Sequence, residues 1–139
     1  MRSNIFLKIR LLEIWLKYFN DTPKRNEIEI KFGRCAVKRL GSIRSIKNPK
    51  NGRLDTLIYI NGYFRDPKIP EFMIDATIAH ELCHYAQGFA SPLPQLSPYP
   101  HRGGAIDKEV IARGLGHLIK FEKKWLKKYW FRYISLENK

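Results

Sequence analysis

The sequence predicts one small α+β domain, with a helix, three strands and further helices in that order. A chain of 139 residues can bury one core but is too short for two domains of ordinary size. Its hydrophobic content of 44% and charged content of 28% are typical of globular proteins. Along the chain, the spacing of apolar residues changes from a helical period to the alternation typical of strands and then back to a helical period. We therefore treat residues 1–139 as a single domain.

Residues 1–20 form an expected N-terminal amphipathic helix, because apolar residues recur there at three- and four-residue steps. The stripe expected to be buried is Ile5, Ile9, Leu12, Trp15 or Leu16, and Phe19. Charged residues interrupt this run, so it is predicted to be neither a signal peptide nor a membrane span. We expect it to pack on the domain. Its basic charge and aromatic residues leave binding to a membrane surface as an alternative.

Residues 27–61 are predicted to form a three-stranded sheet. Polar and apolar residues alternate over 27–32, which is typical of a half-buried strand. A second strand is expected over 35–44, with Gly41 as a bulge or bend, and a third over 54–60.

The rest of the chain is predicted to be helical, apart from a loop over 89–103 that is rich in proline. Residues 71–88 are predicted to form a helix that Gly88 ends, and 104–133 a C-terminal helical region with expected kinks at Gly114 and Gly116. Three aromatic residues in that region recur every fourth position: Phe121, Trp125 and Tyr129. This stripe either packs on the core or forms a binding surface, with the neighbouring lysines meeting phosphates and the rings stacking on bases.

The strongest functional signal is the pattern H-E-x-x-H, formed by His80, Glu81 and His84. Residues four apart on a helix share a face, so both imidazoles can bind one Zn²⁺ ion. Glu81 is offset by about 100° and can reach a metal-bound water as a general base. The alternative is a solvated helix with two incidental histidines. The apolar residues around the motif argue against it, since buried His and Glu need partners.

A catalytic zinc site needs a third protein ligand, which is expected to be His101 or Glu109. His101 ends the proline-rich loop, which could return the chain to the metal. Glu109 lies on the helix that follows. We favour His101 and interpret His117 as an ordinary surface residue of a helix.

Charge is unevenly distributed along this strongly basic chain, whose formal net charge is +13. Residues 1–54 and 102–139 carry a large excess of Lys and Arg, whereas residues 55–101 are mildly acidic. Basic flanks suggest nucleic acid as a partner, although many small proteins are basic for solubility alone. Two cysteines, Cys35 and Cys83, make no disulfide framework, and we expect a cytoplasmic protein.

Taken together, these segments resemble the SprT-like family of small zinc metallopeptidases. Phe32 to Ile43 (FGRCAVKRLGSI) is similar to the family's glycine-containing strand pair, and Leu57 to Phe64 (LIYINGYF) to its final strand and turn. Ile78 to Tyr85 (IAHELCHY) is close to its core motif, and Pro100 to Gly104 (PHRGG) resembles its third-histidine element.

The resemblance implies a zincin-like fold, one zinc ion, His80, His84 and His101 as ligands, and Glu81 as the base. It also implies that the strand Leu54–Ile60 lies at a sheet edge near the motif helix, where an extended peptide could pair with it. Such an enzyme hydrolyses peptide bonds with metal-activated water, and Glu81 passes the proton to the leaving amine. Some members act on proteins attached to DNA. The alternative is a basic nucleic-acid-binding domain with a structural or non-catalytic zinc site.

The sequence also departs from the family pattern near the third ligand. Arg102 follows His101, where the family usually has glycine, and the next large apolar residue is Ile106 rather than position 105. The cysteine-rich zinc ribbon of some members is absent. Small gluzincin-like peptidases, with Glu109 as the ligand, are the nearest competing family.

Overall fold

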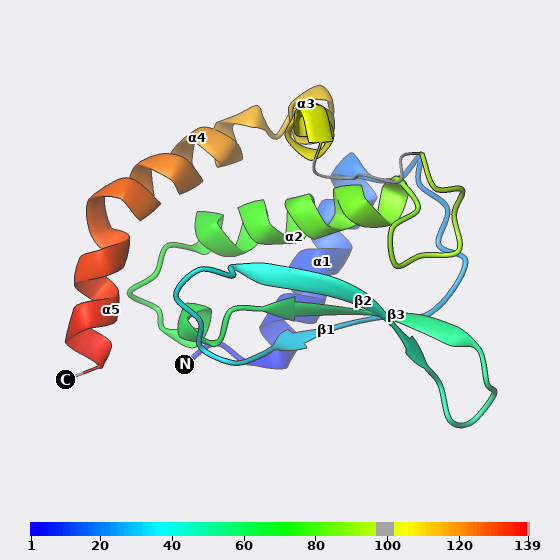
Figure 1. Ribbon diagram of the computed structural model, residues 1–139, viewed down its shortest axis with the longest axis horizontal. Coiled ribbons are helices and arrows are strands. Elements are labelled where there is room, and N and C mark those ends of the chain that lie inside the picture. Colours follow the sequence, from blue (N-terminus) through cyan, green and yellow to red (C-terminus); the bar gives the residue numbers. More distant parts are fainter. Residues whose placement is uncertain (97–101, 139) are drawn as a thin grey trace.

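The computed structural model describes residues 1–96 and 102–138 and has the mixed α+β class expected from the sequence (Figure 1). Its elements in chain order are α1 (Asn4–Tyr18), β1 (Ile28–Phe32), β2 (Gly41–Lys47), β3 (Leu54–Ile60), η1 (Gly62–Arg65), α2 (Glu71–Ala86), η2 (Arg102–Gly104), α3 (Ala105–Ala112), α4 (Gly116–Trp125), η3 (Leu126–Trp130, a π-helical turn) and α5 (Phe131–Glu137). Within these residues, no helix has both the length and the apolar character needed to cross a bilayer.

The sheet has the strand order β1-β3-β2, with β1 parallel and β2 antiparallel to β3. Side chains in register form two rows across one face, Ile30–Ile58–Ile43 and Phe32–Ile60–Gly41. On this side, α1 contacts β1 while α2 contacts β2 and β3. The expectation that Leu54–Ile60 lies at an edge is therefore wrong, because β3 is the central strand and β2 is an edge.

The bounds predicted for the second strand, residues 35–44, are also wrong, since β2 spans Gly41–Lys47 and shares only its first four residues with that range. Residues 33–40 instead form a loop whose backbone bonds to side chains from elsewhere in the fold. The buried Asn61 amide donates to the carbonyl oxygens of Ala36 at 2.7 Å and Arg39 at 2.9 Å. The Trp130 indole donates to the carbonyl of Val37 at 2.7 Å. These bonds satisfy backbone groups that a strand would have paired in a ladder.

Helix α1 buries only part of the stripe expected. Phe19 is buried and Trp15 half-buried, as predicted, but Ile5, Ile9, Leu12 and Leu16 are each more than half exposed, and Leu7 and Ile14 are buried instead. The helix carries apolar residues on two faces, so periodicity alone could not decide which one meets the sheet. An ion pair supports the observed orientation, because Arg10 bonds Asp75 of α2 through both carboxylate oxygens, at 2.9 and 2.6 Å.

The C-terminal helices run as an arc beside α2, from α3 to the chain end (Figure 1). The expected break occurs at Gly114, which has a φ of 86°. Beyond it, the buried stripe includes Leu118, Trp130 and Ile134. The predicted aromatic stripe consists of Phe121, Trp125 and Tyr129. Two of its residues are exposed: Phe121 by 49% and Tyr129 by 43%. The core-packing interpretation of that stripe is therefore wrong for these two residues.

Replacing Asn61 should destabilise the fold strongly. Its side chain also accepts from the backbone N–H groups of Ala36 and Tyr63, so Asn61→Ala leaves several partly buried backbone groups without partners. We expect the free energy of unfolding, measured with urea, to fall by about 2–4 kcal/mol. The matched control is Asn51→Ala, which removes one bond in an exposed turn and should cost less than about 1 kcal/mol. Equal losses for the two variants would contradict the role assigned to Asn61.

Candidate metal centre

Helix α2 carries the H-E-x-x-H motif and is buried along most of its length. Eleven of its 16 residues are buried, among them Glu81, Cys83 and His84. The helix ends as predicted, with Gly88 at a φ of 84°. The N–H of Gly88 bonds the carbonyl of Tyr85, and that of Phe89 bonds the carbonyl of His84, which is the Schellman pattern. The motif therefore lies in the last two turns of a well-terminated helix.

The structure brings His80 and His84 together on one face of α2. Their ring centroids are 4.9 Å apart, with the ring planes inclined at 70°. His84 is only 2% exposed, and its ring lies 5.3 Å from that of Phe89, whereas His80 is partly exposed. Two imidazoles one helical turn apart are a donor pair that suits Zn²⁺.

Glu81 lies beside this pair in a desolvated position. It is 5% exposed, and burial raises the pKa of its carboxyl group to about 7, an effect that the positive charge of Arg39 opposes. A carboxyl group with a pKa near neutrality can both accept and release a proton, as a general acid–base group must. A cation bound next to Glu81 would favour its ionised form.

Strand β2 approaches the motif helix closely because residue 41 is glycine. A Cβ atom at Gly41 would overlap Cγ2 of Thr77 and would lie 3.8 Å from Cγ of Glu81. In the row Phe32–Ile60–Gly41, the missing side chain leaves room for α2. An edge strand thus runs directly beside the catalytic candidate Glu81.

No group of three or more His, Cys, Asp or Glu side chains able to hold a metal occurs within residues 1–96 and 102–138. The predicted ligand His101 lies outside the described residues. Glu109 is described and has other partners, because Gln87 and Arg113 each donate a 2.8 Å hydrogen bond to a different one of its carboxylate oxygens. Arg113 also bonds the carbonyl of Tyr18, which links α3 to α1. Glu109 therefore belongs to a network that joins three helices.

Three further residues lie in surroundings that fit packing or surface roles: Cys83, Cys35 and His117. Cys83 is a buried free cysteine, as a packing residue should be, and burial raises the pKa of its thiol. Cys35 is exposed and free. His117 is exposed at the start of α4, with its ring 5.9 Å from that of Phe121, which agrees with the surface role expected for it.

Sequence reasoning missed three residues that shape this site: Arg39, Thr77 and Gln87. Thr77 had a recoverable signal, because it lies four residues before Glu81 and so on the same face of the helix. The pairing of Glu109 with Arg113 also follows i,i+4 spacing. Arg39 had no such signal, since only the tertiary fold brings its loop close to Glu81.

Searches of protein-family models, curated proteins and solved structures find no match to this chain. The assignment of a function therefore depends on the residues of the site.

Substituting Gly41 should separate α2 from β2. Gly41→Ala is expected to lower the free energy of unfolding by about 1–3 kcal/mol, because the new methyl group overlaps Thr77. The partner variant is Thr77→Ser, which removes Cγ2 and keeps the hydroxyl that donates to the carbonyl of Met73. The double variant should lose less than the sum of the two single losses. The losses in the free energy of unfolding are measured by chemical denaturation. If they are strictly additive, the contact between residue 41 and Thr77 does not set the spacing between α2 and β2.

Proposed function

We propose that this protein is a zinc-dependent metallopeptidase of the SprT-like kind, with a zincin-like fold and one zinc ion. The observation that carries the proposal is the paired imidazoles of His80 and His84 beside the buried carboxyl group of Glu81. A desolvated acid next to two metal donors combines the groups that hydrolysis by activated water requires. The free cysteines Cys35 and Cys83 support a reducing, cytoplasmic location.

Zinc would be held by His80 and His84, with His101 as the third ligand. The hydrogen bonds that Glu109 accepts from Gln87 and Arg113 support His101 over Glu109. When bound, zinc would polarise the scissile carbonyl and lower the pKa of a water ligand to about 7.

Glu81 would accept the proton of the attacking water and return it to the leaving amine. Its burial supports this role, because a desolvated carboxylate is a stronger base than an exposed one. Arg39 would keep part of the Glu81 population ionised. The same carboxyl group would then serve both proton transfers.

The substrate would be an extended peptide that pairs with β2. This strand is an edge strand and passes beside Glu81 at Gly41, where strand addition would bring a peptide close to the motif. The basic charge of the two flanks supports proteins associated with DNA as substrates. The same charge favours the second candidate function, a nucleic-acid-binding domain whose zinc site is structural or non-catalytic.

Metal content should identify the third ligand. We expect about one zinc ion per wild-type chain, with zinc lost in His101→Ala and kept in Glu109→Ala. Elemental analysis of the three purified proteins, with circular dichroism to confirm folding, makes this comparison. Zinc loss only in Glu109→Ala would favour the gluzincin-like arrangement. A wild-type protein that takes up no zinc, even after incubation with the metal, would contradict the enzyme proposal.

Glu81→Gln should abolish turnover and leave zinc bound. The amide keeps the size of the side chain but cannot accept the proton from water, so we expect a loss of peptidase activity of about 100-fold or more. Cleavage of an unstructured protein is measured with and without DNA, alongside zinc content. The matched control is Glu109→Gln, which lies outside the proposed chemistry. Full activity in Glu81→Gln would refute the mechanism.

A further inference from the structure

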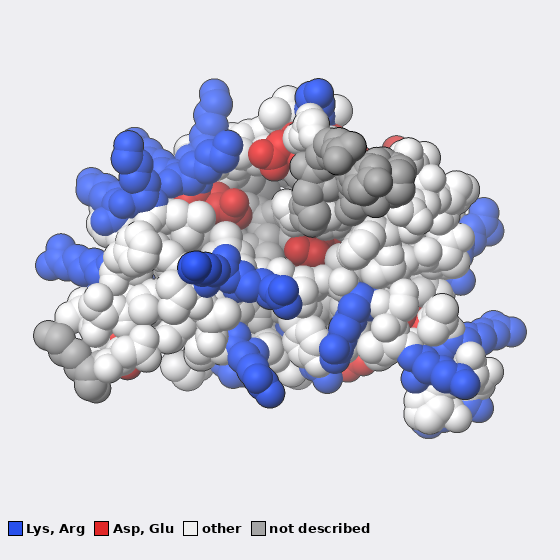
Figure 2. Space-filling model, in the orientation of Figure 1, with Lys and Arg blue, Asp and Glu red and all other residues white. Residues whose placement is uncertain are grey.

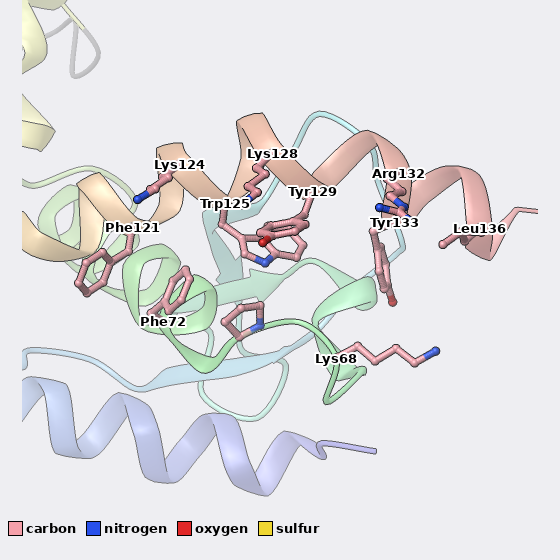
Figure 3. Close-up of a pocket in the computed structure, with 11 residues that line it drawn as sticks. Lys68, Phe72, Phe121, Lys124, Trp125, Lys128, Tyr129, Arg132, Tyr133 and Leu136 are labelled. Carbon is pink, nitrogen blue, oxygen red and sulfur yellow. The ribbon is translucent and has the colours of Figure 1, made fainter.

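A long groove lies between the C-terminal helices and the segment that leads into α2. It has a volume of about 920 Å³, and Figure 3 shows its side chains along one side of α4, η3 and α5. Phe121 and Phe72 of α2 meet at one end, with ring centroids 5.6 Å apart. The lining of the groove contains none of His80, Glu81 and His84, so this concave surface lies outside the proposed peptidase site.

The walls of the groove combine cations with aromatic rings. Its lining includes four basic residues, Lys68, Lys124, Lys128 and Arg132, and no carboxylate. None of these four takes part in an ion pair within the part of the chain that the structure describes. Figure 2 shows Lys and Arg side chains gathered over the region of α4 and η3. Asp66 lies beside Lys68 at one end, but the lining as a whole carries an excess of positive charge, which favours a polyanion.

The aromatic residues add flat apolar surfaces beneath this charge. Phe121 and Tyr129 are about half exposed, and Trp125 lies between them with its ring 5.9 Å from that of Tyr129. The segment Leu126–Trp130 is a π-helical turn, a feature frequent at functional sites. Exposed rings in a row offer stacking surfaces to unpaired bases.

We propose that this groove binds single-stranded nucleic acid. Lys124, Lys128 and Arg132 repeat every fourth residue, about 6 Å apart along a helix, and so present a line of cations to a phosphate backbone. The rings of Trp125 and Tyr129 are accessible to unpaired bases, whereas the base faces of a duplex are already stacked. The groove requires no zinc, so this inference is independent of the peptidase proposal.

The first test compares two triple variants by fluorescence anisotropy with a labelled oligothymidylate of about 12 nucleotides. The groove variant is Lys124→Gln, Lys128→Gln and Arg132→Gln. The control variant is Lys120→Gln, Lys123→Gln and Lys127→Gln, which removes the same charge from the same exposed helical segment, outside the groove lining. We expect a loss of affinity of about tenfold or more for the groove variant and less than about threefold for the control.

The second test separates stacking from charge. Tyr129→Ala should weaken oligothymidylate binding by about tenfold, because one base loses its stacking partner. Phe131→Ala is the control, since Phe131 is 75% exposed but does not line the groove, and it should leave affinity unchanged. Unfolding midpoints are compared for all variants, so that a loss of fold is recognised.

Several outcomes would overturn the inference. Equal losses in the two triple variants would show that binding follows net charge alone. Unchanged affinity in Tyr129→Ala, or tighter binding of a duplex than of the single strand, would exclude base stacking in the groove. Absence of oligonucleotide binding by the wild-type protein at low salt would exclude the site itself. The assay contains no peptidase substrate, so its result does not depend on whether the peptidase proposal holds.

Discussion

Helix α2 packs at the same time against the sheet, α1, α3 and α4. Because eleven of its 16 residues are buried, polar side chains in its second half are removed from water by the fold itself. Desolvation of a carboxyl group costs free energy unless a proton or a nearby cation neutralises it. The raised pKa of Glu81 reflects the free-energy cost of burying its ionised form. The same packing that stabilises the core would therefore prepare the motif for the proposed proton transfer and the proposed metal ion.

Two features keep the surroundings of α2 in place. Gly41 allows β2 to lie close to Thr77 and Glu81, and the Asn61 side chain fixes the loop that precedes β2 through three hydrogen bonds. Arg39 belongs to that loop, so its charge near Glu81 depends on a buried amide far from the motif in sequence. The electrostatics of the site therefore depend on backbone hydrogen bonding in this loop as well as on the motif residues.

Sequence patterns predicted those elements that are determined by residues close together in the chain. The motif helix, its ending at Gly88, the extent of the third strand and the break at Gly114 all followed from periodicity and glycine chemistry. Tertiary contacts decided the rest. Residues 35–40 have strand-like composition, yet Asn61 and Trp130 hold them as a loop. Helix α1 has two apolar faces, and packing on the sheet with the ion pair to Asp75 selects one of them. These outcomes depend on contacts between residues far apart in the sequence, which sequence periodicity does not predict.

The proposed groove and the proposed peptidase site share helix α2. Phe72, in the first turn of α2, contacts Phe121 at the end of the groove, and His80 lies eight residues further along the helix, about 12 Å by helical rise. A strand held in the groove would keep any protein bound to it close to the motif. Tethering of this kind raises the effective concentration of a substrate without new contacts at the catalytic residues. A basic groove beside a peptidase site would therefore select substrates by what they are attached to, rather than by the sequence at the cleaved bond.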